Sequence, residues 1–346
     1  MKILIATDAW QPQVNGVVRT LGHVAREARV LGADMEFLAP DSFWTVPMPS
    51  YPEIRLALAA PGDVERQLER ARADAIHIVT EGPLGHAVRR VCMRRNQPFT
   101  TSFHTRFPDY LAGRLPVPER WTSNVAWAWL RRFHAPGAAV LAATPTLVTE
   151  LGERGFHDVK LWPRGVDAQL FRPRRAPTLD LPRPIFLTVG RLAVEKNIEA
   201  FLKLDLPGTK LVVGDGPARA QLVKAFPDAV FLGSRQGEDL AKIYASADVF
   251  VFPSRTDTFG LVLLEALASG VPVAGFPAVA PRDVIGEAPV GVLDEDLRLA
   301  CLGALDLSRQ NCRDFALELT WQASTRAFLN HVTQITQVAR PVAGAA

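Results

Sequence analysis

Cysteine is scarce in this chain, and its scarcity restricts the chemistry that can be expected. The three cysteines, Cys92, Cys301 and Cys312, have no spacing typical of a metal site, and three thiols cannot all pair with one another in disulfides. The lack of a disulfide framework is typical of proteins from a reducing compartment. We therefore expect a cytoplasmic protein.

Long apolar runs and a strong charge of one sign are also missing. No uninterrupted apolar segment approaches the roughly 20 residues of a membrane-spanning helix. The opening segment, Met1–Asp8, is typical of a buried strand and lacks the cleavage region of a signal peptide. The net charge of +3 is too small to indicate nucleic-acid binding, although it permits a weak attraction to anionic lipid.

Short apolar runs, in contrast, recur throughout the chain. Its 346 residues, 48% of them hydrophobic, are enough for two well-cored domains. Short β-rich runs alternate with amphipathic stretches, which predicts an α/β fold with parallel sheets and crossover helices. The predicted strands are Lys2–Asp8, Met35–Ala39, Ala75–Val79, Phe99–Phe103, Ala139–Ala143, Ile185–Val189, Lys210–Val213, Val230–Leu232, Val249–Phe252 and Pro272–Ala274.

A segment rich in proline and arginine divides the pattern into two halves. It begins at Phe171 and continues through Pro184, which predicts a linker over 169–182. The first domain is then 1–168 and the second 183–319, followed by an amphipathic closing helix over 320–338.

Each half opens with a strand that runs into a glycine-containing loop. These loops contain Gly16 and Gly190, and neither has the three spaced glycines of a dinucleotide site, which disfavours a nicotinamide or flavin cofactor. Asp8, Asn15 and the amide of Gly16 are candidates for contacting a ligand at the first of these loops. Turn and cap duty before a helix over 17–31 is the alternative explanation.

The segment Asp257–Glu265 is the most informative part of the chain. Its two acids bracket the start of a helix, whose free N–H groups and positive dipole end suit an anion. Glu265 lies about two helical turns beyond Asp257 and inside an apolar run, where a charge needs a partner. A nucleotide-sugar fits such a site, because a diphosphate separates its sugar hydroxyls from its ribose hydroxyls. A solvated amphipathic helix is the alternative.

Two basic residues, Arg191 and Lys196, follow the predicted strand 185–189. Open α/β sheets bind ligands at this end of their strands, and two cations there can hold a departing phosphate. The alternative is a solvated basic pair. Gly214 and Arg235 follow the next two strands and are secondary candidates, since a strand-to-helix turn explains Gly214 adequately.

Three motifs together resemble the retaining GT-B glycosyltransferases of family 4. They are Gly-Arg…Glu-Lys-Asn at 190–197, the acids of 257–265, and Ser-Phe-His-Thr at 102–105. The resemblance spans most of the chain and implies two Rossmann-like, doubly wound parallel-sheet domains that face each other across a cleft. It also implies that the last helix returns to the first domain. The family usually has Glu where this chain has Asp257, which bears on sugar specificity but not on the reaction type.

The resemblance further implies an enzyme that transfers a hexose or hexuronic sugar from a nucleotide diphosphate, with UDP favoured over GDP. Transfer is expected to retain the anomeric configuration and to need neither metal nor cofactor. The implied catalytic residues are His104, Arg191, Lys196 and Asp257. The implied donor-binding residues are Gly16, Gly190, Gly214, Arg235, Thr258, Phe259, Gly260, Leu261 and Glu265, and those of the acceptor side are Asp8, Asn15 and Arg106.

The acidic run Asp294-Glu295-Asp296 offers a competing reading. An Asp-x-Asp after an apolar strand can hold a metal on a diphosphate, as in single-domain GT-A enzymes. Acidic residues are equally favoured at a helix start, and cations upstream already suit the phosphate. We predict a helix start here and no metal.

Four apolar residues, Trp121, Val125, Trp129 and Phe133, recur every four positions with arginines beside them. Such a stripe packs into a core or lies at a membrane surface. Because several relatives with a similar Ser-Phe-His-Thr region glycosylate lipids, we expect a lipid acceptor such as diacylglycerol and peripheral attachment to the inner face of the cell membrane.

Other functions stay open at this point. One is a GDP-mannose-dependent α-mannosyltransferase acting on a glycan or on a polyprenol or inositol lipid. A protein that binds nucleotide-sugars without catalysis is an alternative of another class, which the Asp257 replacement favours. An epimerase or phosphorylase of the same architecture is a third, and the scarcity of lysine disfavours a phosphorylase that needs a pyridoxal-phosphate lysine.

Overall fold

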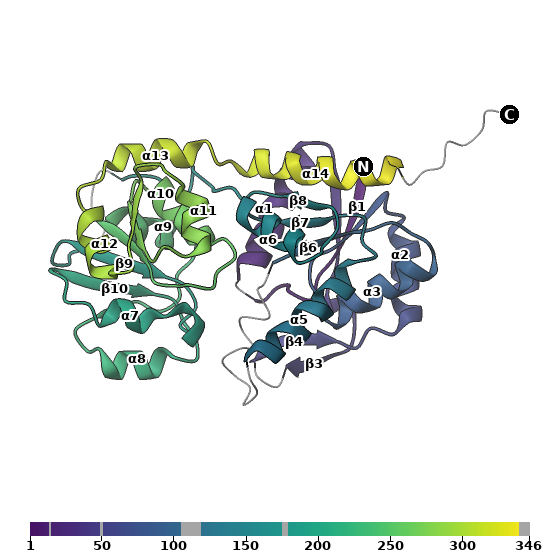
Figure 1. Ribbon diagram of the computed structural model, residues 1–346, viewed down its shortest axis with the longest axis horizontal. Coiled ribbons are helices and arrows are strands. Elements are labelled where there is room, and N and C mark those ends of the chain that lie inside the picture. Colours follow the sequence, from purple (N-terminus) through teal and green to yellow (C-terminus); the bar gives the residue numbers. More distant parts are fainter. Residues whose placement is uncertain (14, 49–50, 105–118, 175–178, 339–346) are drawn as a thin grey trace. The chain divides into compact units, whose positions relative to one another are not determined.

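The computed structural model describes residues 1–13, 15–48, 51–104, 119–174 and 179–338. The chain forms two compact units (Figure 1). Unit 1 consists of Met1–Pro163 and the chain from Trp321 onward, and unit 2 consists of Arg164–Thr320.

Unit 1 contains a six-stranded parallel sheet in the order β2-β1-β5-β6-β7-β8. Its strands are β1 (Lys2–Ala6), β2 (Asp34–Leu38), β5 (Ala75–Ile78), β6 (Thr100–Phe103), β7 (Val140–Ala142) and β8 (Val159–Leu161). A separate antiparallel hairpin is formed by β3 (Thr45–Met48) and β4 (Tyr51–Ala57).

Helices cover the sheet of unit 1 on both faces. They are α1 (Gly16–Val30), α2 (Pro61–Ala71), α3 (Pro83–Arg94), α5 (Glu119–His134), α6 (Pro145–Glu153) and α14 (Trp321–Val338), with a short 3₁₀ turn η1 (Pro40–Ser42). Buried side chains of α2 and α3 pack with Leu4 and Ile78 on one face, where α5 and α6 also pack with Phe103. His77, the neighbour of Ile78 on β5, points to the other face and meets Phe328 of α14.

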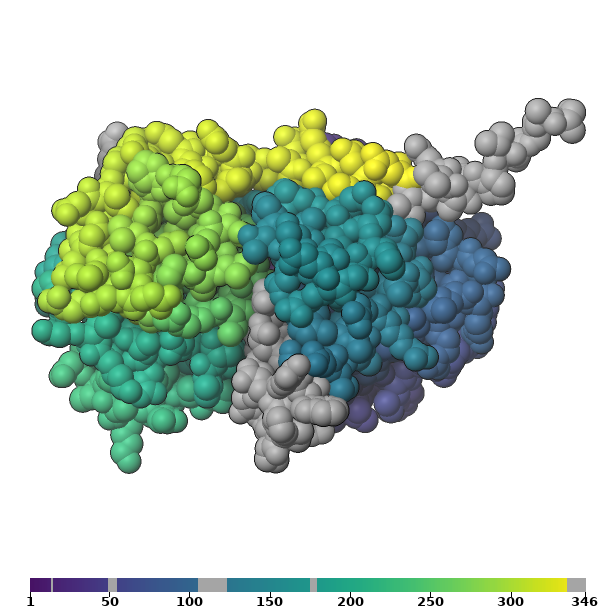
Figure 2. Space-filling model, viewed as in Figure 1, coloured from purple at the N-terminus to yellow at the C-terminus, as the bar shows by residue number. Residues whose placement is uncertain are grey.

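The closing helix α14 belongs to unit 1, although all of unit 2 precedes it in sequence. Its Trp321 ring stacks on His23 of α1 with 4.7 Å between ring centroids, and Phe328 meets the buried His77 ring at 5.0 Å. In Figure 2 the yellow surface of this helix adjoins the teal surface of unit 1. Packing of this apolar face stabilises the helix on unit 1.

Unit 2 repeats the parallel architecture with the order β11-β10-β9-β12-β13-β14. Its strands are β9 (Ile185–Val189), β10 (Thr209–Val213), β11 (Val230–Phe231), β12 (Val249–Phe252), β13 (Val273–Gly275) and β14 (Gly291–Leu293). Its helical segments are η2 (Val194–Lys196), α7 (Ile198–Leu202), α8 (Arg219–Ala225), α9 (Gly237–Ser246), α10 (Leu261–Ala268), α11 (Val279–Ile285), α12 (Leu297–Ala304) and α13 (Arg309–Leu317).

Strand residues of unit 2 alternate between two cores. Phe186 and Val249 pack with α7, α8 and α12, whereas their neighbours Leu187 and Phe250 pack with α9, α10 and α11. Successive side chains of a strand point to opposite faces, so this division places helices on both faces of the sheet. The predicted doubly wound α/β architecture is confirmed within each unit.

The segment expected to act as a linker, 169–182, is in part integral to unit 2. Phe171 is 2% exposed and packs in the core of unit 2, and its carbonyl accepts a hydrogen bond from Arg313 at 2.8 Å. The chain therefore joins unit 2 well before β9. Composition did not indicate this packing, because the one buried aromatic residue, Phe171, is surrounded by proline and arginine. None of the described helices is long and apolar enough to cross a bilayer.

Candidate active site

The strand order of unit 2 reverses between β9 and β12, and ligands of open α/β sheets bind in the crevice outside such a point. From β9 the chain proceeds outward through β10 and β11, and from β12 it proceeds the other way through β13 and β14. The loops that leave these two strands are 190–197 and 253–260. Most residues that the sequence assigned to the donor lie in these two loops or directly after them.

Glycine lets the backbone loops at this edge approach each other closely. A Cβ atom on Gly214 would lie 1.8 Å from the carbonyl oxygen of Gly190, and one on Gly216 would lie 2.5 Å from that of Leu192. The amide of Gly190 donates to Val213 at 3.0 Å, and that of Leu192 donates to Asp215 at 2.9 Å. Gly190 and Gly214 thus fix the backbone of the site, and a donor contact by either remains a prediction.

Lys196 and Asp257 form an ion pair that joins the two loops. The distance between Lys196 Nζ and Asp257 Oδ1 is 2.5 Å, and the two side chains are 26% and 15% exposed. The second oxygen, Asp257 Oδ2, is buried and has no hydrogen-bond partner among the residues that the structure describes. A cation and an acceptor oxygen are therefore available at the same point.

The start of α10 provides uncapped amides beside this pair. Its N-cap is Gly260, with a φ of 83°, and glycine has no side chain that could accept a hydrogen bond from the first-turn amides. Glycine is required here, because a Cβ atom would lie 3.0 Å from the Phe252 ring and the backbone is left-handed. Thr258, Phe259 and Leu261 are half-buried around it.

Glu265 lies in the second turn of α10 and is 3% exposed. Tyr244 of α9 donates its hydroxyl hydrogen bond to Glu265 Oε2 at 3.0 Å. The sequence indicated that this carboxylate needs a partner, and the tyrosine is one. Tyr244 was missed because it stands 21 residues away on another helix, with no local pattern to mark it.

The two remaining basic candidates of unit 2 differ in their distance from the reversal point. Arg191 is half-buried two residues after β9. Arg235 follows β11, from which β9 is separated by β10, and its Nη1 donates to the carbonyl of Ser234 at 3.0 Å. Arg235 is thus exposed at the outer end of the same edge.

Asp8 of unit 1 follows β1 at the point where that sheet reverses. Its two carboxylate oxygens accept hydrogen bonds from the amides of Leu84 and Gly85, at 2.9 and 3.2 Å, and from the Thr80 hydroxyl at 2.9 Å. Burial raises the pKa of Asp8 above its usual 3.8, although the bonds from Leu84 and Gly85 lower it. The Asp8 carboxylate therefore satisfies two free amides in the first turn of α3.

Asn15 has a similar duty at the start of α1. Its side-chain oxygen accepts hydrogen bonds from the amides of Val17 and Val18, both at 3.0 Å. Gly16 is the first residue of α1 and is exposed. The structure bears out the cap explanation for Asn15. Asp8 instead accepts hydrogen bonds from the first amides of α3, and an acceptor role for either residue remains a prediction.

His104 follows β6, and its ring meets that of Trp162 edge to face at 5.9 Å between centroids. This packing partner was not foreseen. Arg106 lies outside the described residues.

The run Asp294–Asp296 starts a helix, as predicted. Asp296 is the N-cap of α12 and accepts hydrogen bonds from the amides of Arg298 and Leu299 at 2.9 and 3.3 Å. Glu295 pairs with Arg255 at 2.8 Å. Throughout the described parts of the chain, no three His, Cys, Asp or Glu side chains gather closely enough to hold a metal.

The predicted apolar stripe of α5 does not form one face. Phe133 is 1% exposed, whereas Trp129 is 38% and Val125 is 67% exposed. A spacing of four residues advances about 40° beyond a full turn at each step, so the stripe drifts from the core to the surface. The buried side instead holds Trp127 and Leu130. The Trp121 side chain lies outside the description.

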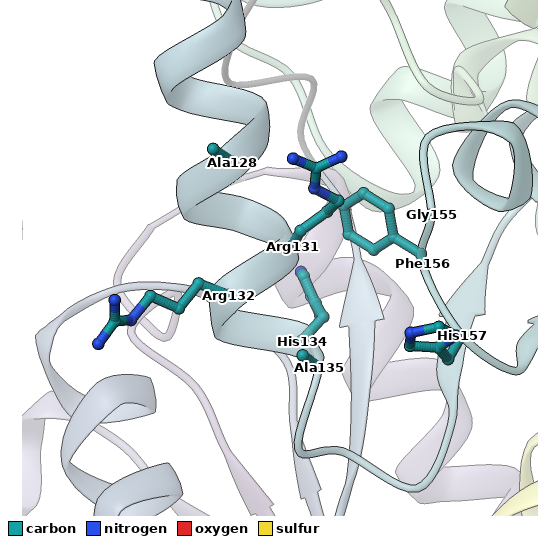
Figure 3. A pocket seen from close by; sticks show the side chains of 8 residues that line it. All are labelled: Ala128, Arg131, Arg132, His134, Ala135, Gly155, Phe156 and His157. Atoms are coloured by element: carbon teal, nitrogen blue, oxygen red, sulfur yellow. The ribbon is translucent and has the colours of Figure 1, made fainter.

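A cavity of about 290 Å³ lies in unit 1 between the end of α5 and the loop after α6 (Figure 3). Its lining residues are Ala128, Arg131, Arg132, His134, Ala135, Gly155, Phe156 and His157. In Figure 3 the side chains of Arg131 and Arg132 point away from each other. His134 is bound to Thr101 at 2.8 Å and to Glu81 at 3.2 Å. No predicted site residue lines this cavity.

Two parts of the chain match known protein families. Residues 14–170 match the family described as Glycosyltransferase Family 4, and residues 183–302 match Glycosyl transferases group 1. A GDP-mannose-dependent alpha-mannosyltransferase from Mycobacterium tuberculosis is 34% identical, with 85% of this chain and 83% of the relative aligned. An alpha-monoglucosyldiacylglycerol synthase from Acholeplasma laidlawii is 24% identical over 79% of each protein.

The fold has close counterparts among solved structures. The sucrose-phosphate synthase of Thermosynechococcus elongatus superimposes with a TM-score of 0.77 at 18% identity, covering 98% of this chain and all of that one. Together with the sequence matches, this shows that the chain belongs to glycosyltransferase family 4 (glycosyl transferases group 1) and has the GT-B class of fold.

Proposed function

We propose that this glycosyltransferase moves a mannosyl group from GDP-mannose, with retention of configuration, to a lipid acceptor at a membrane surface. The observation that carries the proposal is the Lys196–Asp257 pair at the strand reversal of unit 2, beside the uncapped start of α10. This arrangement suits a ligand that carries a diphosphate next to hydroxyl groups.

The cationic side of the pair serves the leaving group. Sugar transfer breaks the bond between the anomeric carbon and the diphosphate, so negative charge grows on the departing phosphate. An ammonium group has three N–H donors, and the bond from Lys196 to Asp257 leaves two for phosphate oxygens. The amides at the start of α10 add donors along the helix dipole, and Arg191 adds a second cation.

The acidic side serves hydroxyl groups. Asp257 Oδ2 is buried and lacks a hydrogen-bond donor among the described residues, so a sugar hydroxyl that reaches it satisfies it. We assign Glu265, oriented by Tyr244, to the ribose at the other end of the diphosphate. The cations of the protein supply the charge that a metal would otherwise supply, so we propose that no divalent ion is required.

The relatives bear on the donor and the stereochemistry. Sequence reasoning favoured UDP over GDP. The 34% identical relative is named for GDP-mannose and for an alpha-mannosyl product, which supports GDP-mannose here. Because GDP-mannose carries its sugar in α linkage, an α product corresponds to retention.

The acceptor assignment is supported by unit 1 and by the second relative. The Acholeplasma relative is named for a diacylglycerol product. Trp129 and Val125 are exposed on α5, which also carries the exposed Arg131 and Arg132 near its end. Exposed tryptophan beside arginine suits the boundary between lipid headgroups and acyl chains.

A donor panel tests the proposal directly. The protein is incubated with GDP-mannose, UDP-glucose or UDP-glucuronic acid and with diacylglycerol, phosphatidylinositol or polyprenyl phosphate in vesicles, before and after dialysis against EDTA. We expect lipid-linked mannose from GDP-mannose alone, an α anomeric signal by NMR, and equal rates in both preparations. Transfer from a UDP-sugar instead refutes the donor assignment. If the protein binds a nucleotide-sugar but forms no free nucleoside diphosphate with any acceptor, it is a non-catalytic binding protein.

A further inference from the structure

Asn197 occupies an unusual backbone position at the end of the loop 190–197. It has φ 52° and ψ 33°, the left-handed conformation that few residues other than glycine adopt without cost. Asparagine tolerates this region better than most side chains. The residue follows Lys196 directly and precedes α7.

From this position the Asn197 side chain reaches the loop after β12. Its Nδ2 donates a hydrogen bond to the carbonyl of Pro253 at 3.1 Å, across 56 residues of sequence. Two weaker contacts lie beside it, because the hydroxyls of Ser254 and Thr256 both lie 3.4 Å from the carbonyl oxygen of Glu195. Three successive residues, 195–197, are thereby attached to the loop that carries Asp257.

Of these contacts, the Asn197 bond is the shortest besides the ion pair itself. Lys196 has a long flexible side chain, and its ammonium can neutralise a phosphate effectively only when its backbone is held in place. Hydroxyl contacts at 3.4 Å hold a loop weakly, whereas the hydrogen bond from the Asn197 side-chain amide, at 3.1 Å, has the usual length. The side chain next to Lys196 thus supplies the shortest of these three neutral hydrogen bonds between the two loops.

We propose that Asn197 is a positioning residue for sugar transfer: its left-handed backbone and its bond to Pro253 hold Lys196 in register with the Asp257 loop. This inference rests on the proposed function, because it assigns Lys196 to the leaving phosphate. Asn197 acts through Lys196 and makes no contact with the donor.

Two substitutions separate the bond from the backbone conformation. Asn197→Gly keeps access to the left-handed region and removes the bond, whereas Asn197→Asp keeps the shape and replaces the donor by an oxygen. A misplacement of about 1 Å at a catalytic group can cost on the order of 100-fold in rate. We expect both variants to lower kcat at least about tenfold, with KM for GDP-mannose changed less than about threefold.

The chain offers a matched control in Asn96. This residue also has a positive φ, 49°, but it is exposed after α3 in unit 1. Asn96→Gly reproduces the change in backbone freedom and is expected to leave kcat and KM unchanged. If Asn197→Gly lowers only the melting temperature, as a purely structural residue would, the positioning role is wrong.

A second measurement does not depend on activity. The coupling between Lys196 and Asp257 is obtained from a double-mutant cycle of Lys196→Met and Asp257→Asn, measured by denaturant unfolding. We expect the coupling to fall to less than half when Asn197 is replaced by Gly. An unchanged coupling refutes the inference, whether or not transfer is observed. Absence of transfer by the wild type together with a reduced coupling refutes the proposed function alone.

Discussion

At the scale of single residues, the chemistry proposed for the donor site depends on contacts between segments far apart in sequence. Arginine and lysine after a strand, and two acids around a helix start, were recognisable from sequence because each motif is local. The roles of Tyr244 and Asn197 were not recognisable, because their partners lie 21 and 56 residues away. Single-sequence reasoning locates charged groups but does not find the neutral groups that orient them.

Lys196 is expected to contribute to catalysis through its charge. Lys196→Met should lower kcat by about 100-fold or more, since it removes a fixed positive group from the departing phosphate. Steady-state kinetics with GDP-mannose measures this loss, and circular dichroism checks that the variant is folded. Lys203→Met is the control, because Lys203 is 65% exposed and pairs with Glu199. A rate within twofold of wild type for Lys196→Met contradicts the assignment.

Tyr244 is expected to support both stability and nucleotide binding. Tyr244→Phe removes the hydroxyl that donates to the buried Glu265 carboxylate, which should cost about 1–3 kcal/mol of unfolding free energy. Urea denaturation measures this loss, and calorimetry should show weaker GDP binding. In a Glu265→Gln background the same change should cost less, because the acceptor no longer carries a charge. Equal costs in the two backgrounds would show that the charge of Glu265 does not strengthen the bond.

At the scale of elements, buried strands were the easiest features to predict. Ile185–Val189 and Val249–Phe252 agree residue for residue with the structure, because both faces of these strands are buried and their apolar runs are continuous. The hairpin β3–β4 was missed, since prolines interrupt its short strands. The stripe of α5 was misjudged because a period of four drifts relative to 3.6 residues per turn.

The start of α3 gives stability a dependence on pH through Asp8. Its pKa is raised in the folded protein, so the folded state takes up a proton at a higher pH than the unfolded chain does. The contribution of Asp8 is fully present below its unfolded value of 3.8 and is lost as pH rises through the folded value. Urea unfolding from about pH 3.5 upward should show this loss in wild type.

Asp8→Asn provides the comparison, because the amide does not titrate. The difference in unfolding free energy between wild type and variant should become less favourable to the wild type as pH rises through this window. If the wild type instead becomes more stable relative to Asp8→Asn as pH rises, the hydrogen bonds from Leu84 and Gly85 outweigh the effect of burial on the Asp8 pKa.

At the scale of the whole molecule, the alternation of strands and helices predicted parallel sheets with crossover helices, and the two doubly wound domains were implied by the family resemblance. The membership of α14 in unit 1 was expected only from the family resemblance. Its amphipathic pattern predicts an apolar face but does not indicate which unit that face packs against. Likewise, composition indicated a linker at 169–182, while Phe171 of that segment is buried in unit 2.

Membrane attachment belongs to this scale and is expected to depend on α5. A Val125→Ser/Trp129→Ser variant should bind vesicles that contain phosphatidylglycerol at least about tenfold more weakly, because it removes exposed apolar area. Vesicle co-sedimentation measures the binding. Trp44→Ser is the control, since Trp44 is 87% exposed but belongs to the segment before β3. Equal losses for both variants would show that binding is nonspecific.

The position of α14 also determines the order in which the units can mature during synthesis. The amino end of a chain emerges from the ribosome first, and domains generally fold as they emerge. Here residues 1–163 leave the ribosome long before Trp321, Phe328 and the rest of α14, which cover the apolar surface beside His23 and His77. Unit 2 is contiguous and can complete itself first. The apolar surface of residues 1–163 that α14 covers therefore stays exposed until unit 2 and α14 have been translated.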